Sequence, residues 1–168
     1  MQTDSKATAV TETGELPARG TSAVEILMND HKVIKSLLDR LTSDTNGDRK
    51  ATLENLKSVL TIHNATEENL VYPALAVVGR KKAESLSLYH ETAEADTVVF
   101  ELDMLLKESN DEQFAKGAKK LQAAVLEHID KEETSAFPQL QEKANAAQSK
   151  QLAHDVREFR NTIHMSKA

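Results

Sequence analysis

One segment of the chain occurs twice. The sequence HNATEENLVYPAL at 63–75 returns as HIDKEETSAFPQL at 128–140, with matched positions 65 residues apart. The matched pairs are His63/His128, Glu67/Glu132, Glu68/Glu133, Tyr72/Phe137, Pro73/Pro138 and Leu75/Leu140. In an α-helix, side chains at i and i+4 lie one turn apart on the same face, so each copy can present a histidine and a glutamate to one ion. The repeat therefore predicts two similar helices, each carrying half of a candidate metal site.

The residues outside the repeat predict an all-α protein. The sequence has Pro 3 and Gly 5 in 168 residues, and long runs rich in Ala, Leu, Glu and Lys alternate with short polar breaks. Helices are predicted at about 22–43, 48–79, 81–108, 111–144 and 148–164. Pro73 is expected to kink or end the second of these helices. We therefore expect an up-down-up-down four-helix bundle over 22–145, an additional C-terminal helix over 146–168 packed against it, and a disordered N-terminal tail over 1–21.

Composition excludes several classes of partner and ligand. The net charge is −6 and there is no basic stripe, so a nucleic-acid partner is not expected. No apolar run approaches the roughly 20 residues of a membrane span, and the first residues lack the pattern of a secretory signal. We therefore expect a cytoplasmic protein that does not bind membranes. The chain has no cysteine, so any bound metal must have nitrogen and oxygen ligands.

Further histidines and glutamates occupy positions at which the helices would face the bundle core. His31 follows the spacing of the apolar residues in the first helix, and His90 and Glu94 form a third pair at i and i+4. Counting about 1.5 Å per residue from the loops puts histidines from all four helices at similar heights. A single core histidine is usually a hydrogen-bonded packing residue, but so many buried polar groups in one layer would each cost several kcal/mol without a compensating cation. The predicted metal ligands are His31, His63, Glu67, His90, Glu94, His128 and Glu132.

This pattern resembles the hemerythrin-like, or HHE cation-binding, domain family over about residues 22–144. The motifs that carry the resemblance are the histidine of the first helix, the three His-x3-Glu pairs and the repeated EE-x3-[YF]-P-x-L. The resemblance implies a non-heme di-iron centre with an oxo or hydroxo bridge, in which iron is favoured over manganese and zinc. It also implies the ligand sets: His31 and His63 on one iron, His90, Glu94 and His128 on the other, with Glu67 and Glu132 bridging.

Counting ligands in this arrangement leaves one coordination position open. We expect a small diatomic molecule or peroxide to bind there, namely O2, NO or H2O2. Glu94 stands where the oxygen-carrying hemerythrins have another histidine, and a third carboxylate would favour the ferric state. This difference favours peroxide or redox chemistry, such as catalase-like decomposition of H2O2, over O2 transport. The alternatives that stay open are a non-enzymatic sensor or binding protein for O2, NO or iron, and a manganese or zinc protein. We expect a monomer or weak dimer, and no separate catalytic residue is predicted.

Residues next to the predicted ligands are expected to have supporting roles. Glu68 and Glu133 should be solvated or lie behind the ligands, because position i+1 is turned about 100° around the helix. Tyr72 and Phe137 are expected to pack at the end of the bundle beside the two prolines. His154 begins a fourth His-x3-Glu pair, which lacks the EE and Pro residues of the repeat and is not predicted to bind metal.

Overall fold

The computed structural model describes residues 22–43 and 48–166, and the tail predicted at 1–21 lies outside them. Within these ranges the regular structure is entirely helical. The elements are α1 (Ala23–Ser43), α2 (Arg49–Thr66), η1 (Glu67–Val71), α3 (Tyr72–Val77), α4 (Lys82–Lys107), α5 (Asp111–Lys131), η2 (Glu132–Ala136), α6 (Phe137–Lys143) and α7 (Ala146–Ser166). The short elements η1 and η2 are π-helical turns that join α2 to α3 and α5 to α6 without a break.

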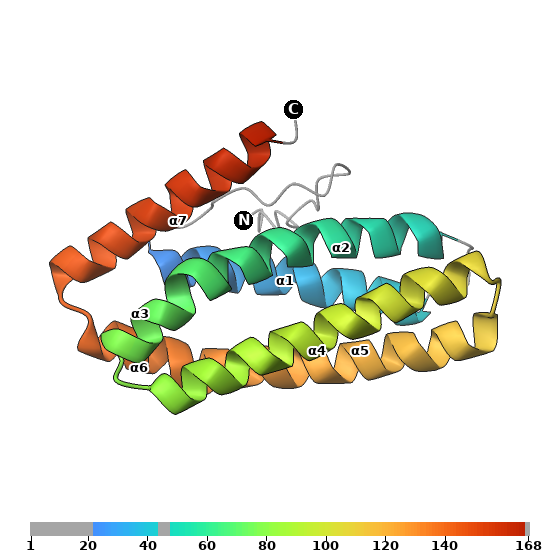
Figure 1. The fold of residues 1–168 in the computed structure, drawn as a ribbon, viewed down its shortest axis with the longest axis horizontal. Coiled ribbons are helices and arrows are strands. Elements are labelled where there is room, and N and C mark those ends of the chain that lie inside the picture. Colours follow the sequence, from blue (N-terminus) through green and yellow to red (C-terminus); the bar gives the residue numbers. More distant parts are fainter. Residues whose placement is uncertain (1–21, 44–47, 167–168) are drawn as a thin grey trace, which may run out of the picture.

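Four long rods form an antiparallel bundle (Figure 1). The rods are α1, α2–η1–α3, α4 and α5–η2–α6. Helix α1 packs against α2 and α5, and α4 packs against α5 on one side and α3 on the other. Helix α7 leaves the end of α6 and crosses back over α1, α2 and η1. The all-α bundle with an added C-terminal helix is therefore confirmed.

The first helix begins with a reciprocal cap between Ser22 and Glu25. The Ser22 hydroxyl accepts a hydrogen bond from the Glu25 amide at 3.1 Å, and the Ser22 amide donates to Glu25 Oε2 at 3.3 Å. This capping box satisfies amides that the first turn leaves unpaired, and it fixes where α1 starts.

Two apolar clusters follow one another along the bundle, and a third, smaller cluster of Ala23, Ile26 and Val156 joins α1 to α7. One contains Ile34, Leu38, Leu56, Leu60, Leu102, Phe114, Leu121 and Ile129 among others, and the second contains Leu27, Val71, Tyr72, Leu75, Leu88, Phe137 and Leu140 among others. On each rod, a buried polar residue lies between the stretches that contribute to the two clusters. These residues are His31, His63, Thr92 and Glu132. A polar layer therefore crosses the bundle between two apolar regions that shield it from water.

The two π-helical turns lie at this layer, immediately before the prolines of the repeat. In each turn a backbone amide bonds five residues back, from Tyr72 to the Glu67 carbonyl and from Phe137 to the Glu132 carbonyl. A proline in an α-helix lacks a donor and clashes with the carbonyl four residues earlier. The wider turn accommodates Pro73, so the rod continues to Val77, near the predicted end at 79, and of the two predicted effects of the proline, a kink or an end, it does not end the rod.

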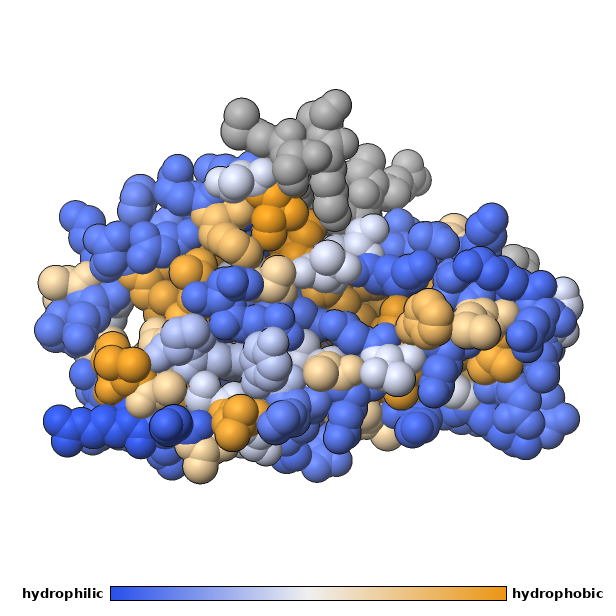
Figure 2. Space-filling model, viewed as in Figure 1, coloured by the Kyte–Doolittle hydropathy of each residue, from blue (hydrophilic) through white to orange (hydrophobic). Residues whose placement is uncertain are grey.

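The surface seen in Figure 2 is mainly hydrophilic, with hydrophobic residues in small separate groups. Large exposed apolar side chains include Val77, Leu86 and Phe100. Among the described helices, none has the length and apolar character needed to cross a membrane.

Candidate metal centre

Four buried side chains converge in the polar layer. His31 comes from α1, His63 from α2, Glu67 from η1 and Glu132 from η2, and each is at most 2% exposed. One nitrogen or oxygen atom from each of the four lies within 4.8 Å of the corresponding atoms of the others. His31 Nε2 is 3.2 Å from Glu132 Oε2, and His63 Nε2 is 3.3 Å from Glu67 Oε2. Three rods thus direct two imidazoles and two carboxylates at one point.

Three atoms of this cluster have no hydrogen-bond partner among the described residues. They are His31 Nε2, Glu67 Oε1 and Glu132 Oε2. His31 Nε2 and Glu132 Oε2 are 3.2 Å apart, but their contact lacks the alignment of a hydrogen bond. An unsatisfied buried polar atom costs about 1–3 kcal/mol. Imidazole nitrogens and carboxylate oxygens are ligands for divalent and trivalent metals, so a cation fits these atoms chemically.

The two carboxylates have opposite pKa shifts when no ion separates them. Burial raises the pKa of Glu67 well above its ordinary value, and the nearby charge of Glu132 adds to the rise. Burial also raises the pKa of Glu132, but the adjacent imidazoles of His128 and His31 outweigh burial and hold that pKa well below its usual range. Two buried carboxylates this close together resist carrying two negative charges, and a bound cation would remove that repulsion.

A family comparison identifies this arrangement. The model of the hemerythrin HHE cation-binding domain matches residues 22–140, which contain all four converging residues. The chain belongs to the hemerythrin HHE family. No curated protein and no solved structure matches it. Family membership and the buried cluster together identify a protein that binds metal cations.

His128, which the sequence also predicted as a metal ligand, lies beside the four converging residues. Its Nε2 is 3.3 Å from Glu132 Oε1, the oxygen that faces away from His31. Burial lowers the pKa of His128, but Glu132 and Glu91 outweigh burial and raise it above its ordinary value. Glu132 therefore connects two sides of the centre, with one carboxylate oxygen toward each.

The structure does not bring His90 and Glu94 to the centre. Both are exposed on α4, which corrects their predicted placement in the buried layer. The inward positions of α4 are Ser85, Leu88, Thr92, Ala95, Val98, Val99 and Leu102. Small and hydroxyl-bearing residues at these positions give a weak hydrophobic pattern, whereas the exposed Leu86 and Phe100 suggest an apolar face that does not exist.

Each histidine of the centre is oriented by a carboxylate behind it. Glu133 Oε1 lies 2.8 Å from Nδ1 of His31, Asp30 Oδ2 lies 3.2 Å from Nδ1 of His63, and Glu91 Oε2 lies 3.2 Å from Nδ1 of His128. A carboxylate on Nδ1 fixes the ring and leaves Nε2 free to bind a metal, as in many metalloproteins. The supporting position of Glu133 agrees with its sequence-based interpretation. Asp30 and Glu91 were missed, although each is adjacent in sequence to a histidine.

Arg160 on α7 extends this support. Its side chain is 1% exposed, and both terminal nitrogens donate to the Asp30 carboxylate while Nε donates to Thr66 Oγ1 at 3.3 Å. Burial raises the pKa of Asp30, but His63 and Arg160 outweigh burial and lower it below its ordinary value. Asp30 is therefore held as a carboxylate between Arg160 and His63. The sequence predicted α7 as an outer packing helix and gave no indication of this buried charge.

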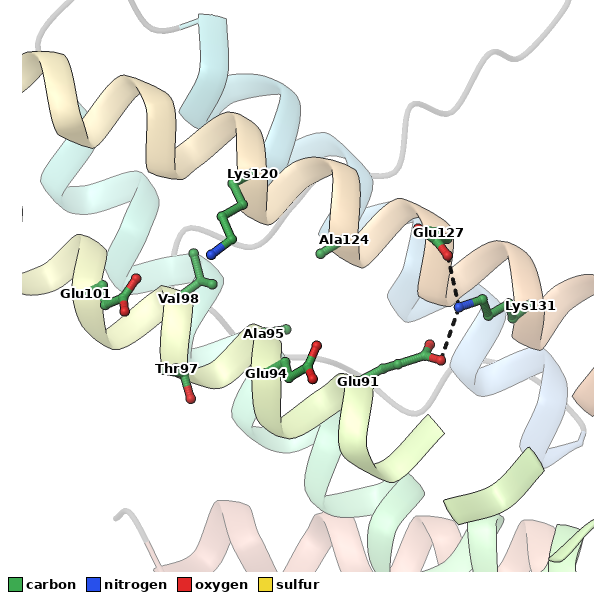
Figure 3. A pocket seen from close by; sticks show the side chains of 10 residues that line it. All are labelled: Glu91, Glu94, Ala95, Thr97, Val98, Glu101, Lys120, Ala124, Glu127 and Lys131. Carbon is green, nitrogen blue, oxygen red and sulfur yellow. Dashed lines mark hydrogen bonds and ion pairs between the residues drawn. The ribbon is translucent and has the colours of Figure 1, made fainter. Parts of the chain in front are cut away.

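A small cavity adjoins the centre and is separated from a surface groove by Glu91. The cavity has a volume of ≈ 20 Å³, and His63, Thr92 and His128 line it. The groove, between α4 and α5, has a volume of ≈ 440 Å³ and shares Glu91 and Ala95 with the cavity (Figure 3). Glu91 bonds His128 on its inner side and Lys131 Nζ, at 3.1 Å, on its outer side.

Proposed function

We propose that this hemerythrin-family protein holds non-heme iron in the cluster of His31, His63, Glu67 and Glu132 and binds a small ligand such as O2, NO or peroxide. Two imidazoles with carboxylates suit iron, and sites of this type keep positions open for a further ligand. The absence of cysteine from the chain removes the thiolates that favour zinc or iron–sulfur clusters. Bound iron would supply the affinity for a small ligand and the capacity for one-electron chemistry.

The cavity beside His63 and His128 carries this proposal. Its volume of ≈ 20 Å³ exceeds the roughly 10–15 Å³ needed for one water molecule. It is far smaller than the roughly 300–1,000 Å³ of sites for organic molecules. The space next to the ligands therefore suits a molecule of two or three atoms and excludes an organic substrate.

The residues around the centre would hold the iron and isolate it. Asp30, Glu91 and Glu133 fix the rings so that each Nε2 faces inward. The two apolar clusters limit access by water along the bundle axis. The groove of Figure 3 and the inner cavity share Glu91 and Ala95, so a small ligand that entered from this groove would pass these two residues.

We propose two ions per chain, as the resemblance implied. The support is the position of Glu132, which directs Oε2 toward His31 and Oε1 toward His128. Such a carboxylate can bridge one ion bound with His31 and His63 and a second bound with His128.

Binding of a small ligand without turnover is the function that we favour. The case for peroxide decomposition used Glu94 as a third carboxylate, and that side chain is exposed. A steady-state assay with H2O2 distinguishes ligand binding from peroxide decomposition. Release of O2 over many turnovers per iron would contradict simple binding.

Titration of the iron-loaded full-length protein with azide and with NO tests the proposal. We expect a saturable spectral change with one ligand bound per centre. Stoichiometric iron with no spectral response to either molecule would contradict a small-ligand site, and failure to bind iron would contradict the metal assignment.

A further inference from the structure

Tyr72 is buried in the centre and has more polar neighbours than a phenol can satisfy. Its side chain is 2% exposed. The Oη atom lies 2.8 Å from Glu132 Oε1, 3.0 Å from Glu67 Oε2, 3.1 Å from His128 Nε2 and 3.4 Å from Thr92 Oγ1. A phenol has one proton, so it can donate to only one of the two carboxylates. Both carboxylates can therefore hydrogen-bond to this oxygen at once only if one of them also carries a proton.

The π-helical turn η1 puts Tyr72 at this position. Residues five apart in an α-helix are turned about 140° from each other, on different faces. In η1 the Tyr72 amide bonds the Glu67 carbonyl, and the wider turn brings both side chains to the same face. At the corresponding place in η2, Phe137 has no hydroxyl and stacks on the His31 ring with 5.7 Å between centroids.

Three atoms on the His128 side have the spacing of metal ligands. Tyr72 Oη, His128 Nε2 and Glu132 Oε1 form a triangle with sides of 3.1, 2.8 and 3.3 Å. Around an octahedral ion with bonds of about 2.1 Å, adjacent ligand atoms are about 3.0 Å apart. The triangle therefore matches one face of an octahedron.

Helix α4 leaves a ligand position unfilled on this side of the centre. His90 and Glu94 are exposed, and the inward residue between them, Thr92, donates its hydroxyl to the Leu88 carbonyl at 3.0 Å. The Tyr72 oxygen lies between Thr92 of α4 and His128, at the side of the centre that His90 and Glu94 were predicted to occupy.

We propose that Tyr72 is a metal ligand, whose phenolate oxygen binds the second ion together with His128 and Glu132. This inference rests on the proposed function, because it requires an iron-loaded centre. On binding, the phenol O–H bond breaks, an oxygen–metal bond forms and the proton leaves to solvent, with no change in the oxidation state of the metal.

Resonance Raman spectroscopy of the iron-loaded, air-oxidised full-length Tyr89→Phe variant tests the assignment. The chain has Tyr 2, at positions 72 and 89, so every tyrosine signal from this variant comes from Tyr72. Tyr89 is exposed, and its replacement should leave the centre unchanged. We expect a phenolate-to-iron charge-transfer band in the visible region and enhanced tyrosine ring vibrations that shift when ring-deuterated tyrosine is incorporated. Iron-loaded protein without these vibrations would overturn the assignment.

The Tyr72→Phe variant is the complementary test. We expect it to lose the visible band and to bind about one iron where the parent protein binds two, while far-ultraviolet circular dichroism stays unchanged. A retained band and full iron content would overturn the inference. If this variant does not fold, the Raman result on Tyr89→Phe decides the question without it.

The results separate this inference from the proposed function. A parent protein that binds iron and azide but shows no tyrosine vibrations overturns only the role of Tyr72. A parent protein that binds no iron overturns both.

Discussion

Arg160 Nη1 lies 3.1 Å from Oδ1 of Asp30, which is 130 residues earlier in the chain, and both side chains are 1% exposed. The second oxygen of Asp30 is 3.2 Å from Nδ1 of His63. Helix α7, which lies beyond the family match at 22–140, thus contributes through this buried pair to the orientation of a candidate metal ligand.

Replacing Arg160 should weaken both the fold and the metal site. Arg160→Met leaves the Asp30 carboxylate buried without its cation, which costs about 3–5 kcal/mol in comparable pairs. Loss of support behind His63 should lower metal affinity roughly 10- to 100-fold. Chemical unfolding and iron titration measure the two effects.

Two further variants provide the controls for Arg160→Met. Lys150→Met changes an exposed cation on the same helix and should be neutral. The double variant Arg160→Met/Asp30→Asn removes both charges and should recover part of the lost stability. Equal stability of Arg160→Met and Lys150→Met would show that the buried pair contributes nothing.

Metal binding should stabilise the protein. A ligand that binds only the folded state at about 100 times its dissociation constant adds about 2.7 kcal/mol. We expect iron to raise the melting temperature of the parent protein. Glu132→Ala should show no comparable increase and should bind fewer than two ions, because Glu132 faces both sides of the centre. Two bound ions in Glu132→Ala would contradict its bridging role.

Narrowing the passage beside Glu91 should slow access of small ligands. Ala95→Leu adds bulk where the surface groove and the inner cavity share a wall. We expect the association rate of azide to fall about tenfold, equivalent to about 1.4 kcal/mol in the barrier. Ala93→Leu, at an exposed position of α4, is the matched control. Stopped-flow rates that are equal in the two variants would place the access route elsewhere.

The fold could be predicted because local signals agree with the tertiary structure. The four rods and their order follow from three local signals: the repeat, the Ser22 cap, and the apolar spacing of α1, α2 and α5. The pattern fails on α4, where Thr92 and Ala95 face inward and Phe100 faces solvent. An assignment based on apolar residues alone selects the wrong face of α4 and places His90 inward. In the packed structure His90 faces solvent.

Two features of the centre had no signal in the sequence. The position of Tyr72 depends on a π-helical turn, and the α-helical period used to assign faces does not apply across it. The contact between Asp30 and Arg160 joins residues far apart in the chain, and a charged residue on an amphipathic helix is ordinarily expected to be solvated.

The most direct test of the centre is the iron content of the full-length protein compared with that of His63→Ala and His90→Ala, each checked for folding by circular dichroism. The buried position of His63 and the exposed position of His90 predict that His90→Ala retains the iron content of the parent protein and that His63→Ala loses at least one iron per chain. Loss of iron in His90→Ala with retention in His63→Ala would contradict the site formed by His31, His63, Glu67 and Glu132.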